Sequence, residues 1–149
     1  MILATLFLLT NAVYGQKSNP QYDAELAKTL GADAYGMKSY VLAILRSGPN
    51  KTQDKSLRDS LFAGHFRNIN RLADLGKLVV AGPFETNANS YRGIFILDVT
   101  TFEEANLLLK DDPTIREKIF EVDLYNWYGS AALPEYLKVH KKIGKLKIE

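Results

Sequence analysis

Apolar and polar residues follow one another along the chain in blocks that predict strands and helices. Residues 39–46 form a continuous apolar run rich in strand formers, and the turn sequence at 47–50 ends it. From about residue 56 to Gly76, one stripe of side chains recurs at steps of three and four, the period of a helix that faces a core. This stripe consists of Leu57, Leu61, His65, Ile69, Leu72 and Leu75.

Two further strands are predicted at residues 77–84 and 91–99, on either side of a polar turn at 85–90. The later strand is apolar on both faces through its middle. Pro83 has no amide hydrogen to give to a strand ladder, so the earlier strand belongs at a sheet edge.

A second helix and a fourth strand complete the pattern. Thr100 and Thr101 each have a glutamate three residues further on, which indicates a capping box in one of two registers. The helix is predicted to reach Lys110, before the breaker at 111–113, and the strand covers residues 119–128. The helix's inward-facing residues are predicted to be Phe102, Ala105, Leu108 and Leu109.

The order strand, helix, strand, strand, helix, strand is that of the ferredoxin-like α+β fold, with a four-stranded antiparallel sheet whose first and third strands are central. Residues 39–46 are apolar on both faces, whereas two helices cover only one face. We therefore predict a homodimer in which two sheets pack face to face. The alternative is cover by the N-terminal helix or by the C-terminal tail of the same chain.

The first fifteen residues are uncharged and mostly apolar, and they end with Val13-Tyr14-Gly15. A membrane-spanning helix needs about 20 residues, so we interpret residues 1–15 as a signal peptide cut before Gln16. The protein is then expected to be periplasmic or extracellular, with no stable membrane span after cleavage. No lysine or arginine precedes the apolar run. An upstream start, an uncleaved anchor and a buried core strand are therefore the alternatives.

The remaining segments flank one main domain, predicted at residues 38–130. Residues 16–37 are interpreted as a linker with a short helix, capped by Asp23 and ended by Gly31. Residues 131–149 are a basic tail, with five lysines and two glutamates from Glu135 onward. We interpret this tail as solvated and partly helical; binding to nucleic acid or anionic lipid is the alternative.

Composition excludes several kinds of chemistry. A chain of 149 residues, 46% hydrophobic and 24% charged, suits one globular domain, and its net charge of +2 gives no reason to expect a nucleic-acid partner. The absence of cysteine excludes disulfides, thiolate catalysis and cysteine metal sites. No spacing typical of a zinc site or of a glycine-rich phosphate loop is found, so neither a metal nor a cofactor is expected.

His65 is the most informative candidate, because a polar ring on an apolar stripe must find a hydrogen-bond partner. It is either a satisfied core histidine or a general acid or base in a pocket between helix and sheet. Tyr125, Trp127 and Tyr128 either stack a planar ligand or close a strand edge or an interface. His140 lies among lysines and is taken as a surface residue.

An ordered set of motifs resembles the YCII-related family. These are Gly64-His65, Leu72, Gly76-Lys77-Leu78 and Gly82-Pro83, followed by Phe102-Glu103-Glu104-Ala105 and Asp112-Pro113. The resemblance covers roughly residues 38–128 and implies the dimeric α+β barrel fold.

The resemblance also implies a small enzyme with a histidine–aspartate pair, here His65 and Asp112. One branch of the family resembles dehydrochlorinases of chlorinated hydroxyquinones, and distant relatives include muconolactone isomerase. Many members carry an arginine and a proline shortly before the histidine, where this chain has Phe62-Ala63-Gly64. A substrate contact at that place is therefore not carried over. From sequence alone, Asp112 is better explained as the residue that stops a helix before a proline.

Two hypotheses about function remain open. In the first, the chain is a lyase- or isomerase-type enzyme that needs no cofactor and acts on a small aromatic or lactone-like molecule, with His65 as the base and Asp112 as its partner. In the second, it is a non-catalytic module that binds a small ligand or another protein.

Overall fold

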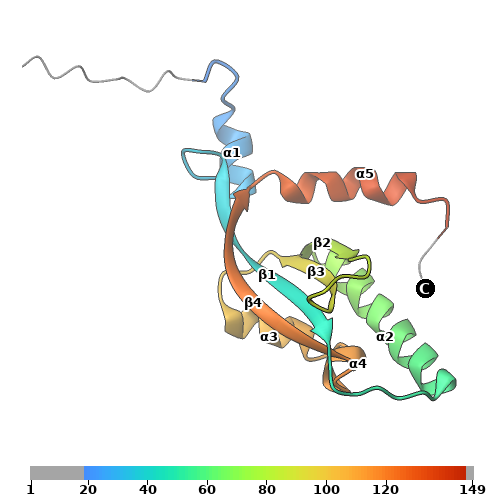
Figure 1. Ribbon diagram of the computed structural model, residues 1–149. Helices are drawn as coiled ribbons and strands as arrows, with labels where there is room; N and C mark the ends of the chain where they lie inside the picture. Colours follow the sequence, from blue (N-terminus) through green and yellow to red (C-terminus); the bar gives the residue numbers. More distant parts are fainter. Residues whose placement is uncertain (1–18, 147–149) are drawn as a thin grey trace, which may run out of the picture.

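The computed structural model describes residues 19–146 as an α+β fold with one antiparallel sheet of strand order β2-β3-β1-β4 (Figure 1). This is the predicted ferredoxin-like plan, with β1 and β3 central and Pro83 on an edge strand. The core elements follow one another as β1 (Met37–Ser47), α2 (Lys55–Asp74), β2 (Leu78–Pro83), β3 (Tyr91–Leu97), α3 (Phe102–Leu109) and β4 (Phe120–Ser130).

Four shorter elements accompany this core: α1 (Ala24–Leu30), α4 (Pro113–Arg116), the 3-10 helix η1 (Leu133–Glu135) and α5 (Tyr136–Ile143). The predicted short helix before the domain is α1. Its N-cap Asp23 accepts a hydrogen bond from the amide of Leu26, and Gly31 ends it at φ 70°. The single turn α4 was not predicted. Within residues 19–146 no helix is long and apolar enough to cross a membrane. The predicted signal peptide lies outside the described residues.

Local signals set the helix ends. The capping box uses the Thr101 register, because the Thr101 hydroxyl accepts from the amide of Glu104 and the Glu104 carboxylate accepts from the amide of Thr101. Gly76 follows α2 with φ 67°, a conformation that favours glycine. The start of α3 and the end of α2 therefore lie close to the predicted positions.

The main core lies between the helices and one face of the sheet. Val41 and Ala43 of β1 and Leu72 of α2 are each 0% exposed there. The predicted stripe of α2 is wrong at its ends, since Leu57 and Leu75 are 44% and 60% exposed. Gly64 and Asn68 are buried on the same helix because α4, which the pattern did not predict, packs against that side.

Phe102 was also predicted to face inward, and this is wrong. It is the first residue of α3 and is 38% exposed. Ala105 and Leu109, which lie further along α3, are buried as expected. The core therefore covers only the later turns of this helix.

The opposite face of the sheet is also apolar, and the C-terminal segment covers one end of it. Leu133 of η1 packs against a cluster formed by Tyr40, Val79 and Ile96. The hydroxyl of Tyr136 donates to the backbone oxygen of Val79 at 2.5 Å. The predicted alternative of a tail that folds back is therefore found for this part of the face.

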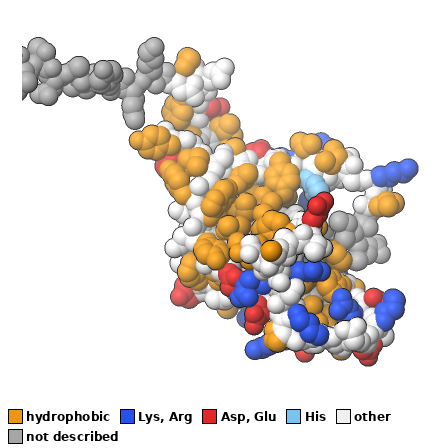
Figure 2. All heavy atoms as spheres, viewed as in Figure 1, with side chains coloured by type: hydrophobic (Ala, Val, Ile, Leu, Met, Phe, Trp, Pro, Cys, Tyr) orange, Lys and Arg blue, Asp and Glu red, His pale blue; other side chains and the backbone are white. Residues whose placement is uncertain are grey.

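The rest of this face is not covered by described residues. Figure 2 shows hydrophobic side chains gathered over it, with charged residues along one margin. Leu42 and Ile44 of β1 are partly exposed, and Tyr125 of β4, which pairs with Leu42, is 48% exposed. The predicted homodimer, in which a second copy would cover this region, therefore stays a prediction.

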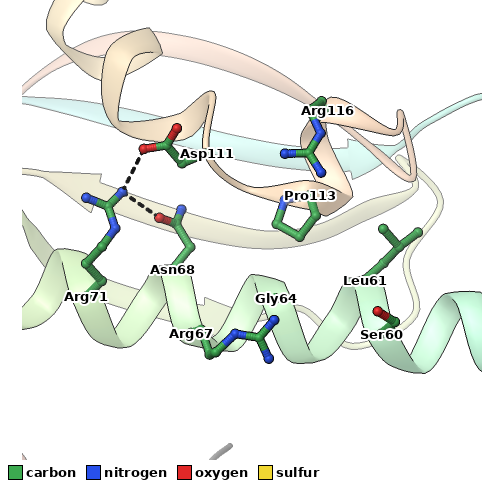
Figure 3. A pocket seen from close by; sticks show the side chains of 9 residues that line it. All are labelled: Ser60, Leu61, Gly64, Arg67, Asn68, Arg71, Asp111, Pro113 and Arg116. Atoms are coloured by element: carbon green, nitrogen blue, oxygen red, sulfur yellow. Dashed lines mark hydrogen bonds and ion pairs between the residues drawn. The ribbon is translucent and has the colours of Figure 1, made fainter.

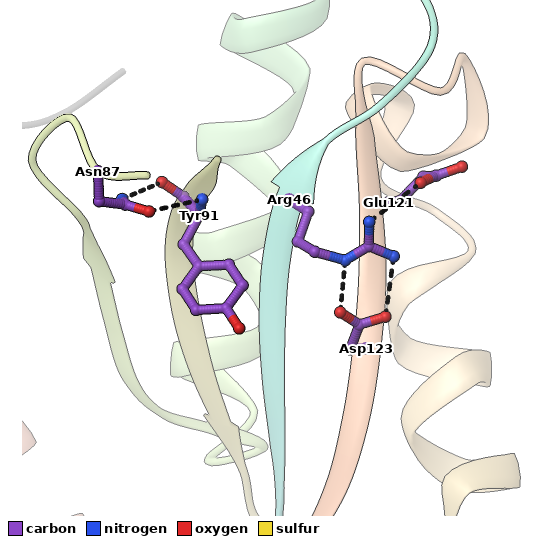
Figure 4. A network of polar contacts seen from close by, with 5 residues as sticks. All are labelled: Arg46, Asn87, Tyr91, Glu121 and Asp123. Carbon is purple, nitrogen blue, oxygen red and sulfur yellow. Dashed lines mark hydrogen bonds and ion pairs between the residues drawn. The ribbon is translucent and has the colours of Figure 1, made fainter. Parts of the chain in front are cut away.

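Polar contacts hold the strands in register at the margin of that face (Figure 4). The guanidinium of Arg46 on β1 donates to both carboxylate oxygens of Asp123 on β4, at 2.5 and 3.0 Å. Hydrogen bonding to Arg46 holds the pKa of Asp123 below its ordinary value. At the β2–β3 turn, the side chain of Asn87 accepts from the amide of Tyr91 and donates to its carbonyl oxygen.

Candidate acid–base site

His65 lies in the middle of α2 and faces the sheet, where it is 7% exposed. The helical period places it one turn after Leu61, so the backbone directs the ring into the core. Four phenylalanine rings surround the imidazole, with ring centroids 5.6 to 6.2 Å from its own. They are Phe62, Phe66, Phe95 and Phe120.

Asp112 is the N-cap of α4, and its side chain is shared between that helix and His65. One oxygen, Oδ1, accepts from the amide of Thr114 at 2.9 Å and from the Thr114 hydroxyl at 2.6 Å. The other, Oδ2, lies 2.6 Å from Nδ1 of His65. The structure thus brings together the two residues that the sequence singled out, and adds Thr114 to them.

The protonation of the pair follows from the state of Asp112. Its side chain is 0% exposed. Burial raises the pKa of Asp112, but the hydrogen bonds from His65 and Thr114 outweigh it and hold the pKa below its ordinary value of 3.8. An ionised carboxylate only accepts hydrogen bonds, so Nδ1 of His65 carries the hydrogen and donates it. The neutral ring therefore has its lone pair on Nε2.

The Nε2 atom is not sealed inside the protein. The side chain of His65 keeps 9% of its surface exposed. Among residues 19–146, Asn68 Nδ2 is the one buried side-chain polar atom without a hydrogen-bond partner. Nε2 of His65 has no partner in this part of the chain either, so it must reach solvent. A free, accessible lone pair next to a buried carboxylate can take up a proton.

Two hollows flank the pair, and the imidazole lines neither. The first, which we call the aromatic hollow, has a volume of about 170 Å³. Phe62 and Phe120, which contact the imidazole, form part of its wall, and three cations stand around it: Lys51, Arg58 and Arg92.

The second, which we call the arginine hollow, has a volume of about 420 Å³ and lies between α2 and α4 (Figure 3). Gly64 and Asp111, the chain neighbours of His65 and Asp112, line it. The predicted pair is therefore formed, but the hollows lie to either side of it.

The other candidates lie elsewhere. Tyr125, Trp127 and Tyr128 line neither hollow. Trp127 packs against Tyr40, and the hydroxyl of Tyr128 donates to Asp33. Their positions on the edge strand β4 agree with the edge-closing interpretation. His140 is exposed on α5, as predicted.

Sequence reasoning missed Thr114 and the cations of the aromatic hollow. A signal for Thr114 was present, because a threonine two residues after an N-cap aspartate can bond to that carboxylate. Arg58 and Arg92 lie far apart in the chain, and no local pattern indicates that they share a hollow. Within the described range, no group of three or more histidine, aspartate or glutamate side chains is placed to hold a metal ion.

We expect the neutral His65 ring to carry its hydrogen on Nδ1, and Asp112→Asn to move it to Nε2. In the variant the amide Oδ1 still serves Thr114, and the amide NH₂ then faces Nδ1, which must accept. Two-bond ¹H–¹⁵N correlation spectra distinguish the two tautomers. The exposed neighbour gives a matched control, since Asp111→Asn should leave the tautomer unchanged. A wild-type ring with its hydrogen on Nε2 would contradict the assignment.

The same pair makes stability depend on pH. Because the folded pKa of Asp112 lies below its ordinary value of 3.8, its stabilising effect is complete above that pH and is lost as the pH falls through the folded pKa. Asp112→Asn should therefore lower the free energy of unfolding by about 1–3 kcal/mol near neutral pH. Denaturant titrations should show that the difference in free energy of unfolding between the wild type and Asp112→Asn becomes smaller below about pH 4. A difference that stays constant down to pH 2 would contradict it.

Comparison with known proteins places the chain in a family. No curated protein matches it. Among solved structures, the chain is similar to the 5-chloro-2-hydroxyhydroquinone dehydrochlorinase of Burkholderia phenoliruptrix AC1100, in complex with 2,5-dihydroxybenzoquinone, at 19% identity and a TM-score of 0.41. The match covers 58% of this chain and 92% of that one. The model of the YCII-related domain matches residues 40–128, more than half of the sequence, and the chain therefore belongs to the YCII-related domain family.

Proposed function

We propose that the chain is a small-molecule enzyme of the lyase or isomerase type, in which His65 transfers protons without a cofactor and Asp112 orients it. The observation that carries this proposal is the 2.6 Å contact between His65 Nδ1 and a carboxylate that is 0% exposed. A purely structural pair does not need an accessible ring nitrogen, whereas Nε2 of His65 reaches solvent. The chain belongs to the YCII-related domain family, and its resemblance to that family implies a histidine–aspartate pair of this kind.

The chemistry uses the lone pair of Nε2. It takes a proton from a carbon or hydroxyl of the substrate, and the bonding electrons stay on the substrate. Asp112 remains ionised and stabilises the imidazolium that results. In an isomerisation the proton returns to a different atom of the substrate. In an elimination the electrons form a new double bond, and the leaving group departs from the adjacent carbon with its bonding pair.

The aromatic hollow supports a small aromatic or lactone-like substrate. Phe62 and Phe120 offer apolar faces to a flat molecule, and Arg58 already lies over the Phe62 ring, 5.9 Å from its centroid. The surrounding cations suit a phenolate or carboxylate on that molecule. The same two phenylalanine rings contact the imidazole, so a molecule in this hollow would lie next to the rings that surround His65.

One observation favours the second candidate, a non-catalytic module for a small ligand or a protein. The imidazole lines neither hollow and is surrounded by four phenylalanine rings. Such packing is also typical of a satisfied core histidine. The two candidates differ in what replacement of the histidine does to turnover.

A thermal-shift screen of small aromatic and lactone compounds should identify a ligand, whose turnover can then be measured. His65→Asn should lower kcat by about 100-fold or more, because the lost proton transfer contributes that much, while the variant remains folded at the assay temperature. The other histidine supplies the control, since His140→Asn on the exposed α5 should leave kcat unchanged. Unchanged turnover with a lower melting temperature in His65→Asn would support the non-catalytic module instead.

We also propose that two copies associate through the open part of the sheet face opposite α2 and α3. The supporting observation is the apolar area over Leu42, Ile44 and Tyr125, which the C-terminal segment leaves uncovered. Removing apolar surface from water is favourable by about 25 cal/mol per Å², and the loss of freedom on association offsets part of this gain. The bidentate Arg46–Asp123 pair forms a polar rim at its margin.

Sedimentation velocity at micromolar concentration should show a dimer. Tyr125→Lys should give a folded monomer, because the side chain is exposed in one copy but a lysine charge would be buried between two. Asn126→Lys is the matched control: it introduces the same charge at the next residue, on the other face of β4, and should remain dimeric. A monodisperse wild-type monomer would rule out this association.

Export is the remaining proposal, and it rests on the uncharged apolar residues 1–15. The mature chain should begin near Gln16, because small residues at positions 13 and 15 suit signal peptidase. Mass spectrometry of the native protein from separated cell fractions measures this directly. Intact Met1 in a soluble cytoplasmic fraction would end the proposal.

A further inference from the structure

The arginine hollow gathers three guanidinium groups from two helices. Arg67 and Arg71 extend from α2, and Arg116 extends from α4 on the other side (Figure 3). Its single acidic lining residue is Asp111, and no lining residue is aromatic. The hollow therefore differs in character from the aromatic hollow beside Phe62.

Asn68 lies in the floor of this hollow with one hydrogen-bond donor unused. The residue is 5% exposed, and its Oδ1 accepts from Arg71 Nη2 at 2.8 Å. Because that contact needs an acceptor, the orientation of the amide group is fixed and Nδ2 is the free end. Nδ2 is the buried atom without a partner in the described part of the chain. A buried donor of this kind calls for an acceptor oxygen.

The arginines are only weakly neutralised by the protein. Arg71 lies 3.3 Å from Asp111 and Arg116 lies 3.3 Å from Glu117, and all four side chains are about half exposed, so these pairs are weak. Within residues 19–146 Arg67 makes no hydrogen bond or ion pair. A guanidinium group binds an oxyanion through two parallel N–H donors. The neighbouring Asp111 and Glu117 leave some of these donors unused, so the oxygens of a ligand could accept from them.

We propose that the arginine hollow binds the phosphate group of a small phosphorylated molecule. Phosphate carries nearly two charges at neutral pH and three acceptor oxygens, which matches several guanidinium groups and the Asn68 donor better than a single carboxylate does. A volume of about 420 Å³ is within the range of small-molecule sites and leaves room for the group that the phosphate is attached to. The site does not depend on whether His65 is catalytic.

The test titrates the full mature protein with inorganic phosphate and with phenyl phosphate at constant ionic strength, followed by ¹H–¹⁵N spectra. Both should shift the amide signals of Gly64, Asn68 and Asp111. Asn68→Asp is nearly isosteric and can still accept from Arg71, so it should keep the melting temperature. It replaces the free donor with an oxygen and should weaken binding at least 10-fold. Arg67→Gln should weaken binding as well.

Arg58→Gln is the matched control, since it removes the same charge from the same helix but at the aromatic hollow. Its phosphate affinity should stay within twofold of the wild type. The proposal is overturned if neither ligand shifts any signal at 10 mM. It is equally overturned if Asn68→Asp binds phosphate as well as the wild type does. The same holds if the shifted amide signals are those of Asn50 and Phe120 and the shifts disappear in Arg58→Gln.

Discussion

The charge on the buried Asp112 is the constraint on which the site depends. A carboxylate without solvent exposure is stable only if other groups replace its hydration. Thr114 supplies two hydrogen bonds from α4 and His65 supplies one from α2. The same contacts therefore do three things: they keep the carboxylate ionised, they place α4 against α2, and they fix the hydrogen of the imidazole on Nδ1.

A close contact between Gly64 of α2 and the ring of Pro113 in α4 makes this arrangement possible. A Cβ atom at Gly64 would lie 2.5 Å from the ring of Pro113, so only glycine allows α4 to approach α2 this closely. One turn of α2 then serves three purposes. His65 points to the sheet, and Gly64 leaves space for Pro113, the residue after Asp112. Asn68 lines the arginine hollow. The His65–Asp112 pair and the arginine hollow are therefore both consequences of one packing contact.

The sequence predicted the sheet, its edges and the helix ends, because each depends on local chemistry: Pro83 at an edge, Thr101 with Glu104, and Gly76 after α2. Prediction from the sequence failed where tertiary packing determines which side chains are buried. Leu57 and Leu75 continue the helical stripe but extend beyond the core, and Asn68 is buried by a helix that the pattern did not show.

Some parts of the candidate site were also predicted from the sequence, and others were not. His65 stood out because a polar ring interrupted an apolar stripe, and Asp112 was assigned through the family motif. Each residue alone had a plain structural explanation, so the pairing itself was visible only in three dimensions. The hollows were not predictable, since residues that line one of them, such as Arg58 and Arg92, are brought together by the fold and by no periodic pattern.

The central strand β1 links the two faces of the molecule. Ala43 pairs with Phe95 and Ser47 pairs with Phe120, so the register of β1 places two of the rings around His65. In a strand, a shift by one residue would turn Leu42 and Ile44 toward the helices and move both rings out of place. Burial of the far face and the Arg46–Asp123 pair both oppose that shift. A partner that covers the far face would therefore stabilise the surroundings of the imidazole without touching it.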